Sequence, residues 1–282
     1  MSKVTAEMVK ELRARTGVSM SKCKEALDQS DCDMEKSIDF LRKAGIASAV
    51  KKEGREVNEG LIGYAESDKA IAIIEINSET DFVAQNEKFK KFIEDVCVEA
   101  SLMKASSVEE LLNLKYSKDD SITIDQYRAL TMQSLGENIQ IKRMLVIPKV
   151  GDLSVGIYSH MGGKIVAATL ISGGSGQELL AREISMHIAA EAPDYLNPSE
   201  VPSDVKAREE DIAKAQMQGK PASMIDKIVE GKIKAFYDQS CLVCQKFIKD
   251  NALTVAAVVE RESKNCGKPL TIQSFIRWKV GG

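Results

Sequence analysis

The run of β-branched and aliphatic residues at 70–76 is the feature that most constrains the fold of this chain. Its first five residues, Ala-Ile-Ala-Ile-Ile, have the composition of a buried strand. An acidic residue and a large aromatic, Asp81 and Phe82, follow a few positions later, and a helical pattern begins shortly after them. The sequence therefore predicts an ordered turn at Asp81 and Phe82, where a strand ends.

Two interpretations of this turn are open. Asp81 could cap the following helix while Phe82 packs beneath it, as in many helix starts. Alternatively, the turn could carry both side chains into a partner. The local spacing alone favours the first interpretation.

The length and charge of the chain bound its class. With 282 residues, two or more modules are expected, and each has enough chain to bury a core. A formal charge of -3 with 29% charged residues gives no general attraction to nucleic acid or acidic membranes. The 6 cysteines are scattered and no apolar signal-peptide block is found, so we expect a reducing cytoplasm. No apolar run reaches about 18 residues, so no membrane span is predicted.

Three short helices are expected first, at 5–16, 21–30 and 34–43. Each is too short to be stable alone, so we predict a small helical bundle over residues 1–50. The charged, glycine-containing segment 51–56 is typical of a linker.

A β-hairpin followed by a helix is expected twice. The predicted elements are strands 61–66 and 70–76 with helix 87–103, and strands 154–159 and 164–171 with helix 177–190. An internal duplication would explain this repeat, but antiparallel hairpins backed by helices are also common.

Further elements follow each hairpin and helix. A helix at 125–135 and a strand at 138–147 follow the first set. A helix at 254–263 and a strand at 270–279 follow the second, and the strand is most simply added to the second sheet. The sequence thus predicts two subdomains of mixed helix and sheet.

Two helical stretches, 203–218 and 222–238, are separated by Gly219, Lys220 and Pro221. Glycine and proline stop one helix and restart the next, as in an antiparallel helical hairpin. The apolar stripe is narrow, which is typical of a two-helix coiled coil that protrudes from the body.

Candidate metal, redox and catalytic sites are weak. Cys241 and Cys244 have the spacing of half a zinc site, but no second paired motif completes it. His187 lies among apolar neighbours on a helix, which favours a hydrogen-bonded structural histidine over a catalytic base. No serine, cysteine and carboxylate pattern forms a triad.

A nucleotide-binding loop is not found either. Every Gly-Lys pair is followed by Pro or Ile instead of the Ser or Thr that a phosphate-binding loop requires. The glycine-rich residues 173–176 precede a helix but lack a lysine, so a tight strand-to-helix turn is the better interpretation.

Three separated blocks stand out: residues 12–17 with Met20, Cys23-Lys24 and Ala26-Leu27; residues 75–84; and residues 186–190 followed by Pro193. Together these blocks resemble the bacterial elongation factor Ts family. Residues 136–139 and 219–221 also fit. The resemblance covers essentially the whole chain in the same order.

The resemblance implies a guanine nucleotide exchange factor for elongation factor Tu, acting in translation elongation in the cytoplasm. Such a factor binds the GDP-bound and nucleotide-free partner, promotes GDP release, and is displaced when GTP enters. It binds no nucleotide, cofactor, metal or nucleic acid itself and catalyses no bond chemistry.

The resemblance also implies which residues touch the partner. Positions matching Asp81 and Phe82 intrude near the magnesium region of Tu, and those matching Arg13 and Met20 dock the bundle. The expected contact surface also includes Thr80, Val83 and His187.

Departures from the family pattern occur at Gln85 and Ser21, where lysine and methionine are frequent. A short C-terminal module that touches Tu in many members has no counterpart after Gly282. Contacts at these places are not carried over.

The expected fold class is α+β, with a ubiquitin-associated-like three-helix bundle, two hairpin-plus-helix subdomains and a coiled-coil hairpin. The expected domains are the bundle at 1–50, the linker at 51–56, a first core subdomain at 57–148, a second at 149–193 with 239–282, and the inserted hairpin at 194–238. The competing functions are a chaperone or scaffold that only holds a partner, and a hydrolase.

Overall fold

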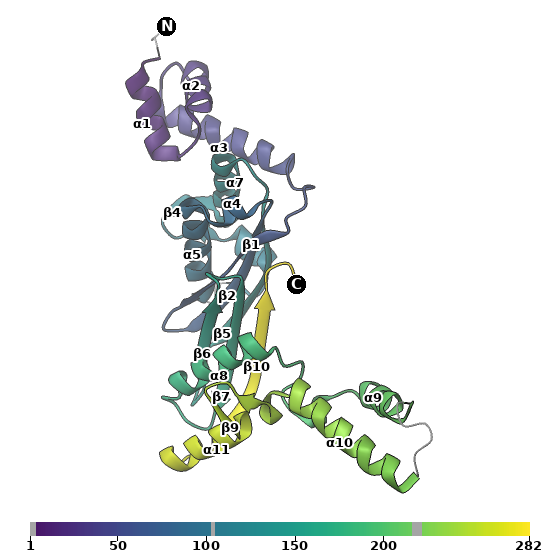
Figure 1. Ribbon diagram of the computed structural model, residues 1–282. Coiled ribbons are helices and arrows are strands. Elements are labelled where there is room, and N and C mark those ends of the chain that lie inside the picture. Colours follow the sequence, from purple (N-terminus) through teal and green to yellow (C-terminus); the bar gives the residue numbers. More distant parts are fainter. Residues whose placement is uncertain (1–3, 103–104, 216–221) are drawn as a thin grey trace. The chain divides into compact units, whose positions relative to one another are not determined.

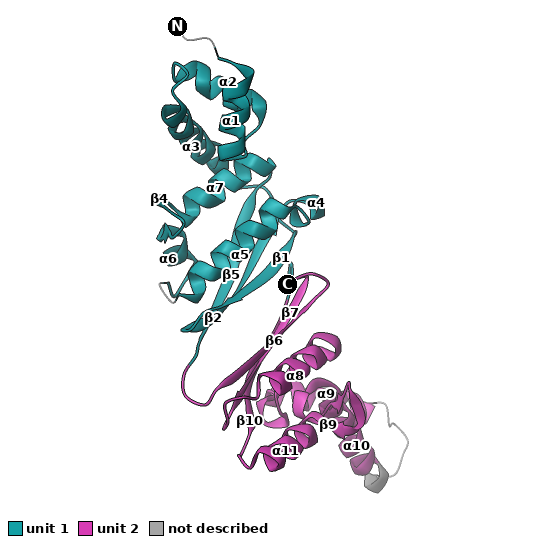
Figure 2. Ribbon diagram, turned by 90° about the vertical axis from the view of Figure 1, so that its left-hand side faces the viewer, with its two compact units in different colours: residues 1–149, 279–282 teal, residues 150–278 magenta. Residues whose placement is uncertain are grey.

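Helices and strands are mixed throughout the part of the chain that the computed structural model describes, residues 4–102, 105–215 and 222–282 (Figure 1). This confirms the expected α+β class. The chain divides into two compact units, Met1–Lys149 with Lys279–Gly282, and Val150–Trp278 (Figure 2).

The first unit begins with three helices, α1 (Ala6–Thr16), α2 (Met20–Gln29) and α3 (Met34–Val50). The Thr5 side chain caps α1 by accepting a hydrogen bond from Met8 N. The three helices share a small core of their own, formed mainly by Leu12, Leu27 and Leu41. The three helices therefore pack around one cluster of buried side chains.

The third helix is longer than expected and continues past Gly45 to Val50. A side chain at Gly45 would place its Cβ 3.1 Å from Gln133 Oε1, so the glycine allows a close approach of helix α7 (Ile124–Leu135). Packing against α7 thus outweighs the low helix propensity of glycine at this position.

The segment 51–56 is fixed along the first unit by several hydrogen bonds. Gln140 Nε2 donates to Glu53 O at 3.1 Å, and Asn138 Nδ2 donates to Arg55 O at 2.9 Å. Arg128 also pairs with the Glu53 carboxylate. The segment 51–56 is thus an ordered connection, because its backbone carbonyls accept hydrogen bonds from side chains of the first unit.

A three-stranded antiparallel sheet forms the centre of the first unit. Its order is β1 (Glu59–Glu66), β2 (Ala70–Ser78), β5 (Ile139–Pro148), and Ile74 of β2 lies opposite Gly63 and Met144. All residues of the middle strand β2 are buried. The strand predicted from 70–76 is thus the central strand of its sheet.

Helix α5 (Glu87–Ser101) packs on this sheet (Figure 2), and its Phe89 and Phe92 side chains are fully buried. Three short elements then precede α7: α6 (Val108–Asn113), β3 (Lys115–Tyr116) and β4 (Asp119–Thr123). A fourth, the single-turn helix α4 (Asp81–Ala84), lies between β2 and α5. None of these short elements was expected.

The second unit has the same kind of sheet, in the order β6 (Ser154–His160), β7 (Ile165–Ser172), β10 (Thr271–Lys279). The last strand joins this sheet, as expected. Helix α8 (Glu178–Glu191) packs on β6 and β7, and β8 (Lys246–Phe247), β9 (Asp250–Thr254) and α11 (Val255–Cys266) follow later.

The two units repeat one another in detail. Each has a hairpin, a helix, a second small hairpin, a 12-residue helix and a third strand beside the second. The small hairpins pair Lys115 with Thr123 and Lys246 with Thr254, and each threonine caps the next helix. The repeated order and register support an internal duplication.

Two helices interrupt the repeat in the second unit, α9 (Ser203–Ala215) and α10 (Ala222–Ser240). They pack against each other, and Ala213 and Ile233 are buried where they meet. The predicted turn at Gly219, Lys220 and Pro221 lies outside the described residues.

The first unit also receives the last residues of the chain. Arg143 donates to Lys279 O at 3.2 Å, and Gly281 N donates at 3.0 Å to Oε1 of Glu75, whose side chain is fully buried. Residues 150–278 are therefore bounded on both sides by the first unit.

Candidate functional site

The turn after strand β2 places Phe82 outward. Its side chain is 84% exposed, whereas Val83 and Ala84, the next two residues, are buried in the core of the unit. Asp81 beside it is also exposed. Helix α4 therefore presents an acidic side chain and an aromatic ring to solvent on one face and closes the core with the other.

The local interpretation of this turn is wrong for both residues. Thr80, not Asp81, is the N-cap of α4, because its hydroxyl accepts from Val83 N at 3.4 Å. Asp81 is the first helical residue, where a negative charge is favourable near the helix start. Phe82 does not pack beneath the helix.

Two carboxylates, which we call the carboxylate bracket (Glu79 and Glu137), fasten the turn to the connection between α7 and β5. Glu137 accepts from Thr80 N at 3.0 Å and from Thr80 Oγ1 at 2.6 Å. In the opposite direction, Glu79 accepts from Asn138 N at 2.6 Å and from Arg55 at 3.2 Å. The turn is thus crosslinked in both directions.

The hydrogen bond from Asn138 N, together with Arg55, holds the pKa of the Glu79 carboxyl below its usual value. Gly136 ends α7 with φ of 87°, a left-handed conformation, and so directs the next residues toward the turn. Glu137 lies within residues 136–139, which fit the family pattern. The sequence nevertheless gave no indication that Glu137 contacts Thr80, because 57 positions separate the two residues.

The two other exposed candidates, Arg13 and Met20, lie on the helical bundle. Arg13 is in the last turn of α1, and Met20 is the first residue of α2 with 44% of its surface exposed. Both side chains are available to a partner.

His187 is buried, which places it apart from these exposed residues. Its Nδ1 accepts from Ile248 N at 3.2 Å, so Nε2 carries the proton and donates to Gln245 Oε1 at 2.9 Å. Burial lowers the pKa of the ring. In this state the side chain joins α8 to the segment 245–248 and has no surface to offer a partner. Val83, with 8% exposure, is likewise part of the core.

We expect His187 to make stability depend on pH. The unfolded chain takes up a proton near pH 6.5, whereas the buried ring resists it, so stability is present above that pH and falls by up to about 1.4 kcal/mol per pH unit below it. Denaturant unfolding from pH 7.5 to 5.5 should show a smaller loss for His187→Gln than for the unaltered chain. His160→Gln, which removes an exposed histidine, is the matched control, and an equal flattening there would contradict the assignment.

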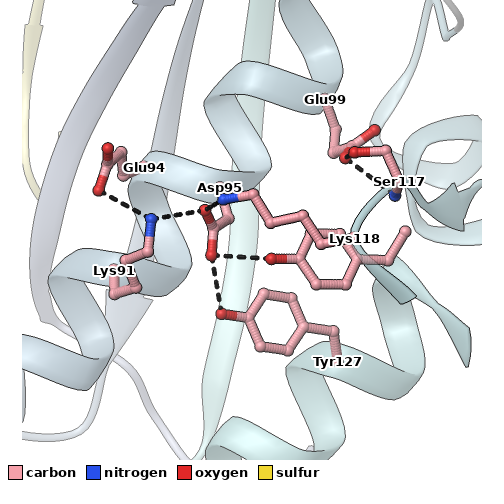
Figure 3. Close-up of polar contacts among 8 residues, drawn as sticks. Lys91, Glu94, Asp95, Glu99, Ser117, Lys118 and Tyr127 are labelled. Carbon is pink, nitrogen blue, oxygen red and sulfur yellow. Dashed lines mark hydrogen bonds and ion pairs between the residues drawn. The ribbon is translucent and has the colours of Figure 1, made fainter.

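Asp95 of α5 occupies a comparable place in the first unit (Figure 3). It accepts from Lys91 and Lys118 at 2.8 Å and 2.6 Å through Oδ1, and from Tyr116 and Tyr127 at 2.9 Å and 3.1 Å through Oδ2. In each unit, a buried polar residue of the long helix therefore anchors the segment of the small hairpin. The periodicity of α5 gave no sign of this network.

Nearby, Glu99 accepts from both the backbone and the hydroxyl of Ser117 (Figure 3). This second carboxylate of α5 is also buried. The side chain of the helix thus fixes the start of the loop between β3 and β4.

The thiol of Cys241 is disfavoured as a thiolate. Cys241 is buried, and burial raises the pKa of its thiol to about 11, away from the thiolate form that metals and redox chemistry require. Among the described residues, no group of three or more histidine, cysteine or acidic side chains could hold a metal ion.

The glycine-rich residues 173–176 form a tight turn between β7 and α8, as expected, with φ of 97° at Gly173 and 90° at Gly176. Within the described ranges, no helix is long and apolar enough to cross a membrane.

Comparison with known proteins bears directly on the family. The profile of the family described as Elongation factor TS matches residues 79–282. The chain is 56% identical to Elongation factor Ts of Protochlamydia amoebophila, 45% to that of Chlamydia caviae and 43% to that of Chlamydia muridarum. Each comparison covers 281 residues, 100% of this chain and 100% of the relative. With its α+β fold and the order of its quoted blocks, the chain therefore belongs to the elongation factor Ts family of translation elongation factors.

Proposed function

We propose that this chain is a guanine nucleotide exchange factor for elongation factor Tu. It binds Tu in its GDP-bound and nucleotide-free states, disturbs the magnesium and phosphate site, and is displaced when GTP binds. The observation that carries this proposal is Phe82, 84% exposed beside Asp81 on a turn crosslinked to the core. A large apolar side chain that the fold presents to water in this way is suited to insertion into a partner.

Exchange of this kind needs no bond chemistry. GDP is bound to Tu through its phosphate charges and a magnesium ion. Displacing a loop that supports the phosphates or the ion therefore weakens the binding of the nucleotide. Because coupling between two ligands is reciprocal, bound GDP lowers the affinity of Tu for the exchange protein by the same ratio as the exchange protein lowers the affinity of Tu for GDP. We therefore propose that the chain is not an enzyme. We also propose that it binds no nucleic acid directly and acts in the cytoplasm.

The turn cannot supply the whole effect. Burying one phenylalanine contributes about 1.5–3 kcal/mol, and each tenfold change requires about 1.4 kcal/mol. Arg13 and Met20 on a ubiquitin-associated-like bundle would add contacts with the nucleotide domain, and the core and the α9–α10 coiled coil would add others. His187 contributes through the packing of the second unit.

A nucleotide release assay tests this function. Tu loaded with fluorescent GDP is mixed with the chain, and we expect release to accelerate with the concentration of the factor and then saturate. Binding without faster release would instead identify a chaperone or scaffold. GTP turnover by the chain without Tu would identify a hydrolase. Repeating the assay over a range of magnesium concentrations should show a changed dependence on the ion; an unchanged dependence contradicts the proposed effect on the magnesium site.

A further inference from the structure

We propose that Glu137 is a positioning residue that holds Phe82 in its projecting orientation; this inference rests on the proposed exchange function. Glu137 lies after α7, 57 positions from Thr80 in sequence. Its carboxylate accepts from the backbone N and the hydroxyl of Thr80, at 3.0 Å and 2.6 Å. Both bonds are partly buried.

The two bonds continue into the helix that carries Phe82. The Thr80 hydroxyl donates to Glu137 and accepts from Val83 N, so one chain of hydrogen bonds leads from the carboxylate to the first turn of α4. An acceptor that is ionised strengthens such a chain. Glu137 therefore fixes the N-cap geometry from which the direction of Phe82 follows.

Helix α4 needs such support. It has 4 residues, a single turn, and helices this short do not persist by their own hydrogen bonds. An exposed phenylalanine gains free energy by folding back onto apolar surface. The burial of Val83 and Ala84 fixes one side of the turn, and the carboxylate bracket fixes its N-terminus.

The charges around the bracket favour this arrangement. Lys52 and Arg55, both from the segment 51–56, lie close enough to interact with the bracket: Lys52 with both carboxylates and Arg55 with Glu79. These cations offset the repulsion between two acidic side chains. Segment 51–56, which connects α3 to β1, therefore interacts with the same turn that carries Phe82.

The test compares Glu137→Gln and Glu137→Ala in the full chain. Glutamine keeps the length and one acceptor oxygen but replaces the other with a donor, so it can retain one of the two bonds. We expect the maximal rate of GDP release to fall by about tenfold for alanine and by less for glutamine, while the half-saturating concentration changes little. Glu66→Gln removes the same charge from an exposed ion pair and is the matched control.

Amide hydrogen exchange gives a readout that does not depend on Tu. The protection of the Thr80 and Val83 N–H groups should be highest in the unaltered chain, lower in Glu137→Gln and lowest in Glu137→Ala. The β2 amides should keep their protection in all three proteins. Unchanged protection of the turn, an unchanged maximal rate, or loss of protection throughout β2 would each overturn the positioning role. If the unaltered chain itself does not accelerate release, the exchange function fails, and the exchange of these two amides still decides whether Glu137 fixes the turn.

Discussion

Replacing Phe82 with alanine is expected to slow the maximal release of GDP from elongation factor Tu by between about tenfold and about a hundredfold. That range follows from the 1.5–3 kcal/mol that burial of one phenylalanine provides in a partner. The unfolding free energy should change by no more than about 0.5 kcal/mol, because the ring is 84% exposed and contributes little to the core. Stopped-flow release of fluorescent GDP and denaturant unfolding measure the two quantities.

The control for this experiment is Val98→Ala, which shortens an exposed apolar side chain of α5 in the same unit. It should leave both quantities near those of the unaltered chain. Asp81→Ala is expected to share the kinetic defect of the Phe82 variant. Parallel losses of melting temperature and release rate in Phe82→Ala would show that the ring supports the fold and would refute its role in exchange.

Replacing Asp95 with alanine is expected to have the largest effect on stability, about 3 kcal/mol, the lower end of the range for breaking a buried ion pair. The lower end applies because Lys91 and Lys118 are half exposed and can return to water. The hydroxyls of Tyr116 and Tyr127 lose an acceptor in the interior. Urea unfolding measures the loss, and Glu94→Gln, which removes only an exposed partner of Lys91, is the control.

The same network predicts the behaviour at low pH. Burial alone would raise the pKa of Asp95, but the hydrogen bonds from Lys118, Lys91 and the two tyrosines outweigh it and lower the pKa. The stabilisation is therefore complete above the unfolded value of about 3.9 and is lost as pH falls below it. The gap between the unaltered chain and Asp95→Asn should narrow through this range; a gap that stays constant would contradict the assigned protonation.

The large elements were predictable because their patterns are local. The buried strand at 70–76, both hairpins and the long helices follow from apolar periodicity and appear in the structure within a few residues of the expected ends. Helix α3 is the main exception, since its extension past Gly45 depends on contact with Gln133 of α7, far along the chain. The small hairpins were missed because two-residue strands such as β3 and β8 carry no alternation.

The candidate site was predictable in part. The strand end located the turn, but local spacing suggested that Phe82 was packed, and only the resemblance suggested that it projects. The orientation of the turn depends on contacts of Thr80 with Glu137 and of Glu79 with Asn138. Local sequence patterns do not reveal these contacts, because the paired residues are far apart in the chain. The burial of His187 likewise depends on Gln245 and Ile248, more than 50 positions away.

The return of residues 279–282 to the first unit means that two peptide connections, near 149–150 and 278–279, join the units. A proteolytic cut at 149–150 leaves residues 1–149 without a covalent link to the rest of the chain, although residues 279–282 still hydrogen-bond to Arg143 and Glu75 of the first unit. A cut at 278–279 releases only residues 279–282 and leaves the two units covalently joined at 149–150. Loss of exchange activity after the cut at 278–279 would therefore report the loss of the contacts that residues 279–282 make with the first unit. Dissociation of residues 1–149 from residues 150–282 therefore requires only the cut at 149–150 and release of residues 279–282 from the first unit.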